Sequence, residues 1–142
     1  MKNLWPDSFE VKDSKSVKEI LDEQSSFLPE LTNGMVLAEV KEMSAGDGLF
    51  LGHNNDFNYT YHIKGRFLKK YSFKVLDFSH PITMYPVLVT IDKSISRDLN
   101  ITVKHTIQDE LEFFAFLERI FKSEKLRDII ASIMKLSPKQ MT

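Results

Sequence analysis

The sequence predicts an α+β fold with an N-terminal helix, a four- to five-stranded, mostly antiparallel sheet and two C-terminal helices. Two kinds of periodicity indicate this. Apolar residues alternate with polar ones in the middle of the chain, and they recur every three or four residues toward both ends. Alternation is typical of a sheet with one solvated face, so we expect the helices to pack on the other. At 142 residues the chain fits one domain, 1–142, with 1–13 and 137–142 loosely ordered.

Residues 16–31 are predicted to form the first helix. Ser16 followed by Glu19 forms a capping box, in which each side chain meets a free amide of the other's turn. Pro29 is expected to kink or interrupt the helix, since it removes a hydrogen-bond donor and clashes with the preceding turn. The apolar stripe consists of Val17, Ile20, Leu21, Leu28 and Leu31.

Strand-like alternation occurs in residues 35–43, 57–63, 71–75 and 84–91, and residues 101–105 suggest one more short strand. The clearest of these strands is 57–63. The inward positions are Val36, Ala38 and Val40, then Phe57, Tyr59, Tyr61 and Ile63, then Tyr71, Phe73 and Val75, then Tyr85, Val87, Val89 and Ile91.

The period changes to that of helices after residue 105. Thr106 is predicted to cap a helix, because acids follow in its first turn. Its apolar positions are Ile107, Leu111, Phe114, Leu117, Ile120 and Phe121, and Phe113 and Phe116 widen the stripe. Ser123 is predicted to begin the last helix. The aromatic helix is expected to lie buried between the sheet and the last helix; an exposed aromatic edge that binds a partner is the alternative.

The composition is that of a cytosolic globular protein. There is no cysteine, which excludes disulfides and thiolate metal sites. The first residues contain acids and a proline where a signal peptide needs an apolar core, and no apolar run is long enough to span a membrane. Charge is uneven: residues 1–56 carry 5 Lys and Arg against 11 Asp and Glu, and residues 57–105 carry 8 against 3. The two regions either orient a partner or neutralise one another.

The stretch GHNNDFNYTYHIK, residues 52–64, holds two of the four histidines. His53 and His62 have no third ligand at a metal-binding spacing, so we expect no metal site. His53 is expected to be a solvated loop residue and His62 an outward strand residue, and replacing both should barely change stability. The chain also lacks nucleophile-elbow, phosphate-loop and dinucleotide motifs. We therefore predict no catalytic residue and no cofactor.

Residues 64–74, KGRFLKKYSFK, interleave basic and aromatic side chains, as some RNA-binding sheets do. The alternation turns Tyr71 and Phe73 toward the core, however. A chain with a pI near 6.4 also lacks the basic field that nucleic-acid binders use. The sequence therefore disfavours nucleic acid as a partner.

Three stretches carry a resemblance to other proteins: ILDEQSSFLPELTNG, the YPV at 85–87, and ELEFFAFLERIFKSEKLRDII. They cover about half of the chain and resemble small bacterial α+β proteins of unassigned function. The resemblance implies a bacterial source and a stand-alone domain. It implies no catalytic residue.

A non-enzymatic protein-binding domain is the leading interpretation, and an immunity protein or antitoxin that occludes a toxin is its most concrete form. The candidate contacts are the acids Asp22, Glu23, Glu30, Glu39 and Glu42, since charge gives such pairs specificity and speed. A secretion-type chaperone is one alternative. Another is a small-molecule pocket between sheet and helix, lined by Tyr59, Tyr61, Tyr85 and Phe114.

Overall fold

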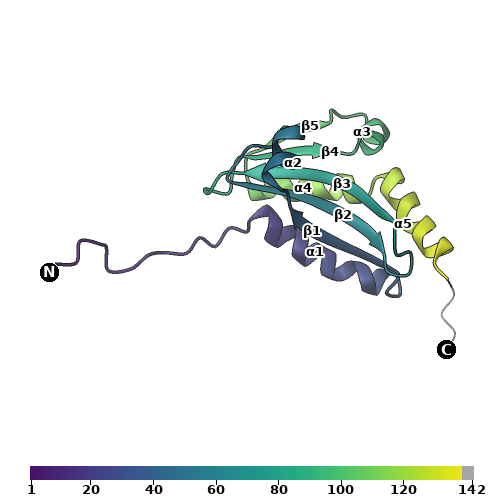
Figure 1. Ribbon diagram of the computed structural model, residues 1–142, viewed down its shortest axis with the longest axis horizontal. Coiled ribbons are helices and arrows are strands. Elements are labelled where there is room, and N and C mark those ends of the chain that lie inside the picture. The colour runs from purple at the N-terminus through teal and green to yellow at the C-terminus, as the bar shows by residue number, and fades with distance from the viewer. Residues whose placement is uncertain (139–142) are drawn as a thin grey trace.

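The computed structural model describes residues 1–138 and confirms an α+β fold around a five-stranded antiparallel sheet (Figure 1). The strands lie in the sheet in chain order, so each pairs with its neighbours in the sequence. The elements are α1 (Val17–Leu31), β1 (Val36–Glu42), α2 (Ala45–Phe50), β2 (Phe57–Gly65), β3 (Ser72–His80), β4 (Val87–Ile91), α3 (Lys93–Leu99), β5 (Lys104–Ile107), α4 (Glu110–Phe121) and α5 (Glu124–Leu136).

β2 shows the predicted alternation. Tyr59, Tyr61 and Ile63 are buried, whereas Thr60 and His62 between them are half-buried. The buried side chains join a single hydrophobic core that includes residues of α1, α4 and α5. These three helices therefore pack on one face of the sheet.

β3 departs from the predicted alternation at one residue. Tyr61 lies opposite Leu76, but His62 lies opposite Lys74, which leaves Val75 as the extra residue of a β-bulge. Val75 is fully buried all the same. Beyond the bulge every residue of β3 is buried, so this strand is covered on both faces.

α1 corrects the prediction of an interruption at Pro29. The helix runs through Pro29 to Leu31, and the Ser16–Glu19 capping box is present as predicted. Pro29 stands near the helix end and removes only one amide donor from the ladder. Two hydroxyls of the preceding turn bond to helix carbonyls, Ser25 to Leu21 and Ser26 to Glu23.

Two short helices lie where the sequence suggested none. α2 occupies the glycine-rich connection after β1 and is capped by Ser44. α3 follows β4 and is capped by Asp92, whose carboxylate accepts two backbone amides. α4 begins at Glu110 with Asp109 as its cap, so the predicted start at Thr106 is wrong, and Thr106 belongs to β5.

The aromatic helix is not buried in the predicted way. Phe113, Phe116, Leu117 and Ile120 of α4 are buried, but Leu111 is 81 % exposed and Phe114 is 39 % exposed. The buried stripe therefore keeps Leu117 and Ile120 of the predicted one and includes Phe113 and Phe116, which were expected to widen it, but not Leu111 or Phe114. The strand predicted at 84–91 likewise begins only at Val87, after Pro86, which lacks an N–H group.

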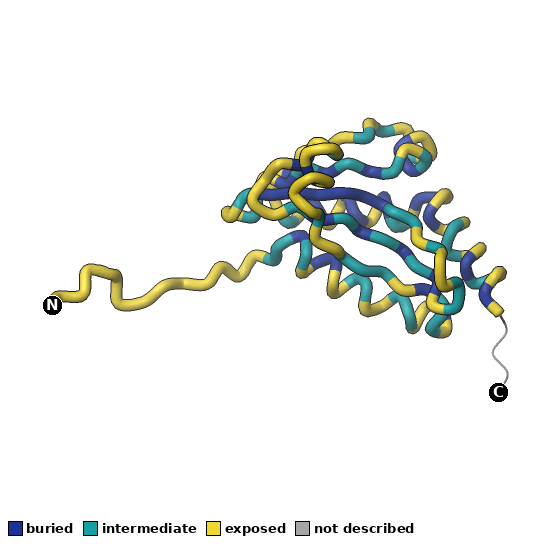
Figure 2. The backbone as a smooth tube through the Cα atoms, viewed as in Figure 1, coloured by how far each residue is buried: buried dark blue, intermediate teal, exposed yellow. Residues whose placement is uncertain are grey.

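The two ends of the chain differ. Residues 1–16 contain no helix or strand and form an arm that projects away from the body, almost entirely exposed (Figure 2). At the other end, Ser137 is buried and its hydroxyl donates to the carbonyl of Ile133. The predicted frayed tail, 137–142, falls largely in residues 139–142, which lie outside the described residues.

Candidate functional site

An apolar groove opens in the helical layer, between α1 on one side and α4 and α5 on the other. Its larger part has a volume of about 310 Å3, and an adjoining part of about 210 Å3 shares Gln24 and Phe121 with it. The larger part is lined by Gln24, Phe27, Leu28, Leu31, Thr32, Tyr61, Ile63, Phe121, Leu126, Ile130 and Met134. The smaller part is lined by Gln24, Phe114, Leu117, Glu118, Phe121 and Lys122.

Tyr61 of β2 forms the floor of this groove and connects its two walls. Its hydroxyl lies 2.8 Å from Ser25 Oγ on α1, and its ring stacks on Phe121 of α4 with centroids 6.2 Å apart. Burial raises the pKa of Tyr61 to about 12, so the phenol stays neutral at physiological pH. The floor is thus uncharged and held from both sides.

The rim of the groove exposes apolar side chains from both walls. Phe27 is 54 % and Leu31 is 77 % exposed on α1, and Phe114 is exposed on α4. Placing Leu31 on the buried stripe was therefore wrong. Contiguous exposed apolar residues on a folded chain mark an interaction surface.

The predicted pocket residues are only partly brought together. Tyr61 lines the larger part of the groove and Phe114 the smaller part. Tyr59 is buried elsewhere in the core and stacks on Phe78, with centroids 5.0 Å apart. Tyr85 donates its hydroxyl to the backbone carbonyl of Lys15, at the start of α1. The sequence did not single out the groove residues on α5, because only the gap between helices distinguishes them from core residues.

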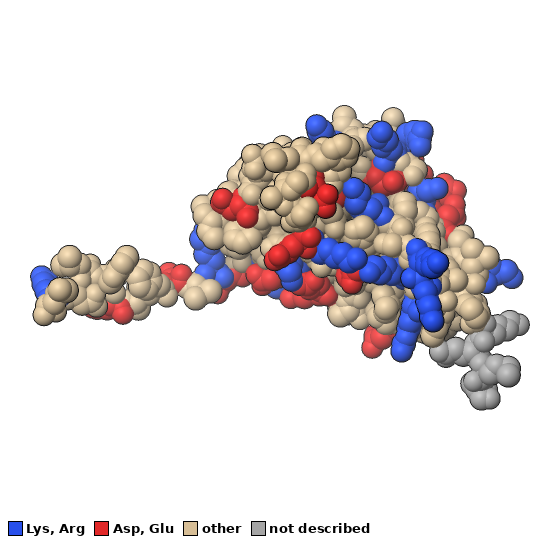
Figure 3. Space-filling model, in the orientation of Figure 1, with Lys and Arg blue, Asp and Glu red and all other residues tan. Residues whose placement is uncertain are grey.

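The predicted acidic contacts do not form one surface. Glu39 and Glu42 are three residues apart on β1, so their side chains lie on opposite faces of the sheet. Glu39 pairs with Lys64 and Lys41, and these lysines hold the pKa of its carboxyl below its usual value. Asp22 pairs with Lys18 at 2.7 Å. Figure 3 accordingly shows red and blue side chains intermixed along much of the visible surface.

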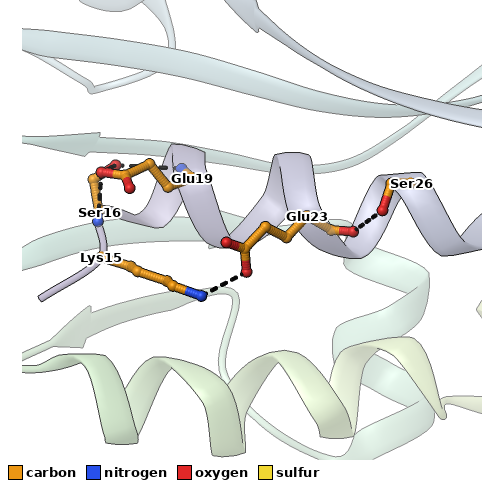
Figure 4. Close-up of polar contacts among 5 residues, drawn as sticks. All are labelled: Lys15, Ser16, Glu19, Glu23 and Ser26. Atoms are coloured by element: carbon orange, nitrogen blue, oxygen red, sulfur yellow. Dashed lines mark hydrogen bonds and ion pairs between the residues drawn. The ribbon is translucent and has the colours of Figure 1, made fainter.

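Two of the five acids do flank the groove. Glu23 and Glu30 lie four residues before and three residues after Phe27, so all three share one side of α1. The carboxylate of Glu23 forms an ion pair with Lys15 at 2.8 Å, on the side of α1 that faces α4 (Figure 4). Both carboxylates are exposed and Lys15 offsets one of them, so the α1 wall of the groove carries an acidic edge with a net charge of two acids and one lysine, −1.

The environment of His53 differs from the one predicted for the stretch 52–64. It is 1 % exposed, lying between α2 and the second face of the sheet, and the prediction of a solvated loop histidine is wrong. Its Nδ1 lies 2.7 Å from Ser79 Oγ and its Nε2 3.0 Å from Thr90 Oγ1. Burial lowers its pKa, which keeps the ring neutral. This face of the sheet is therefore not fully solvated.

The polar cluster around His53 has no catalytic geometry. Ser79 is fully buried, so its hydroxyl cannot meet a substrate, and Asp77 is paired with Lys74 at 2.9 Å through Oδ2. Within residues 1–138, no group of three or more His, Asp or Glu side chains is placed to hold a metal ion. The cluster fixes α2 and its connection onto the sheet.

The other histidines also have structural contacts. His62 lies on the outer sheet face as predicted, 2.9 Å from Thr60 Oγ1, and burial together with nearby lysines lowers its pKa. His80 is buried and stacks on Phe57. His105 packs its ring on Phe116, with centroids 4.8 Å apart.

No protein-family model, curated protein or solved structure matches this chain. None of the helices within residues 1–138 has both the length and the apolar content to cross a bilayer. The groove between α1 and α4–α5 is the feature on which a function can be argued.

Proposed function

We propose that this chain is a non-enzymatic protein-binding domain and that its groove between α1 and α4–α5 receives an apolar segment of the partner. The observation that carries this proposal is the exposed apolar rim formed by Phe27, Leu31 and Phe114 above the buried floor of Tyr61. An amphipathic helix that lies in a groove buries residues of this kind on both partners. Burial of each large side chain stabilises such a complex by about 1.5–3 kcal/mol before ordering costs.

The acidic edge of the groove favours a partner with basic residues beside its apolar segment. Glu23 and Glu30 are exposed next to Phe27, where they attract Lys or Arg of an incoming chain. An immunity protein or antitoxin that occludes a basic toxin is the concrete form that we propose. Asp22, Glu39 and Glu42 lie outside the groove and would act only as long-range charges.

A small apolar ligand is the second candidate. The larger part of the groove, at about 310 Å3, is at the lower limit of pockets that hold small molecules. Its few polar groups, such as Thr32 and Gln24, suit a ligand without charge. The open rim favours a protein segment instead, because a small ligand would leave Leu31 exposed.

The test is a capture experiment in the source cell with three tagged chains, read by mass spectrometry. The groove variant is Phe27→Ser with Leu31→Ser, and the matched control is Leu49→Ser with Phe50→Ser on α2, where both residues are also exposed. We expect the wild type and the control to retain one stoichiometric partner. The groove variant should capture at least tenfold less of that partner than the wild type does.

Equal retention by all three chains would refute the groove as the binding surface. Native mass spectrometry of the purified wild type separates the second candidate, since a co-purified small molecule adds a discrete mass. Glu23→Gln with Glu30→Gln is expected to slow association and to reduce its dependence on salt.

A further inference from the structure

The N-terminal arm carries apolar side chains that the rest of residues 1–138 leaves largely exposed. Leu4, Trp5, Phe9 and Val11 are all more than two-thirds exposed, and the arm projects away from the body (Figures 1 and 2). Trp5 and Phe9 pack against each other, with ring centroids 6.4 Å apart. They form a compact apolar unit of a size that anchors protein interfaces.

A second groove lies at the other end of the molecule, between α5 and the connection from β2 to β3. Its volume is about 640 Å3. Leu68, Tyr71, Ile129 and Ile133 contribute its apolar surface, and Ile133 is buried. Lys69, Lys70 and Lys125 stand at its edge together with one acid, Asp128, which gives the edge a net charge of 3 − 1 = +2.

The arm and this groove are complementary in charge as well as in polarity. Residues 4–11, LWPDSFEV, contain Asp7 and Glu10 and no Lys or Arg, so their net charge is −2. The same eight residues hold all four exposed apolar side chains named above. Acids interleaved with Trp and Phe match a lysine-edged apolar groove.

The chain's own arm is too short to bring all of residues 4–11 into its own groove. The arm joins α1 beside Tyr85, whose hydroxyl bonds to Lys15 O. The other end of α1 lies near the β2–β3 connection, where Arg66 N–H donates to Met35 O shortly after the helix. Fifteen residues of α1 separate these two ends, or about 22 Å. Val11 is five residues from Ser16 and reaches at most about 18 Å, Phe9 reaches about 25 Å only if fully extended, and Trp5 reaches about 40 Å. The groove extends from this connection to α5, so within one copy Trp5 could enter it but Val11 could not.

We propose that two copies of this chain form a symmetric dimer in which residues 4–11 of each copy lie in the lysine-edged groove of the other. A second copy removes the limit of reach, and reciprocal exchange closes the assembly at two chains. Trp5 and Phe9 occupy the apolar surface, and Asp7 and Glu10 face the lysines. This inference uses a surface distinct from the groove of the proposed function and goes beyond it.

Charge reversal tests the contact by sedimentation velocity of the full chain over a range of concentrations. We expect wild type to sediment as a dimer, at twice the 16.5 kDa of one chain. Lys69→Glu with Lys70→Glu should raise the dimer dissociation constant at least tenfold. Adding Asp7→Lys with Glu10→Lys to the same chain should return that constant toward the wild-type value. Trp5→Ser with Phe9→Ser should give monomers, while Leu49→Ser with Phe50→Ser should not. The proposal would be overturned by a monomeric wild type, or by a fourfold charge-reversed variant that dimerises no better than the variant with the two lysine substitutions alone.

Engineered cysteines distinguish docking between copies from docking within one copy. The chain has no cysteine, so Phe9→Cys with Ser132→Cys introduces the only two thiols, one on the arm and one in the groove. We expect mild oxidation to give a covalent dimer on a non-reducing gel. A monomer that holds an internal disulfide, or no disulfide at all, would overturn the exchange.

Discussion

Replacing His53 with alanine is expected to lower the free energy of unfolding by about 3 kcal/mol. The imidazole is almost fully buried, and its two nitrogens bond to Ser79 at 2.7 Å and Thr90 at 3.0 Å. Each bond contributes about 1 kcal/mol net, and the space left by the ring adds about 1 kcal/mol. Ser79 keeps the bond that Asn55 donates, so its hydroxyl is not left without a partner. For a chain of this length, such a loss lowers Tm by roughly 10 °C.

Urea unfolding followed by circular dichroism measures this change, with His62→Ala as the matched control. His62 also makes two side-chain hydrogen bonds, to Thr60 and Ser72, but it is half-exposed, so water replaces them at a cost below about 1 kcal/mol. The expectation that both histidines could be replaced at little cost thus applies to His62 alone. Equal effects at the two positions would refute the argument from burial, and an unchanged His53→Ala would refute the placement of its ring.

Three further predictions concern pH and packing. Burial lowers the pKa of His53 and His62, so stability should be fully present above pH 6.5 and fall from pH 6.5 to 5; a midpoint in urea that is the same at both pH values would contradict this. Phe73→Asp puts a charge against the core and should cost several kcal/mol, whereas Ser72→Asp, one residue earlier and exposed, should cost under 1 kcal/mol; similar melting curves would refute the register. Gly65→Ala places a methyl 3.0 Å from side chains of α5 and the next loop, so the free energy of unfolding should fall by about 1–3 kcal/mol; an unchanged Tm would contradict this.

The sheet and the longer helices were predictable because their periodicity is local. β2 alternates as the sequence indicates from Tyr59 onward, although Phe57 is 37 % exposed, and α5 begins after Ser123 as predicted. The capping box of α1 was equally readable, since all of its atoms belong to four consecutive residues. These features depend on neighbours in the sequence and on no distant contact.

What the sequence did not predict depends on contacts between distant residues. His53 is buried only because β3 and β4 bring Ser79 and Thr90 beside it, 26 and 37 residues away. α2 is an exception, because it lies in a glycine-rich stretch that composition assigns to a loop and its cap at Ser44 is a local signal that could have revealed it. Leu111 and Phe114 of α4 are exposed because of how the helix packs on the rest of the core, which no period within α4 records.

α5 connects the two grooves, and this determines which substitutions can separate their roles. Leu126, Ile130 and Met134 line the groove shared with α1, whereas Ile129 and Ile133 line the lysine-edged groove. A substitution on α5 would therefore disturb both walls, because adjacent residues of one helix move together. Variants on α1 and on the β2–β3 connection each touch one groove only. The two surfaces act independently if the α1 variant loses partner capture but still dimerises, and the lysine variant loses dimerisation but still captures the partner.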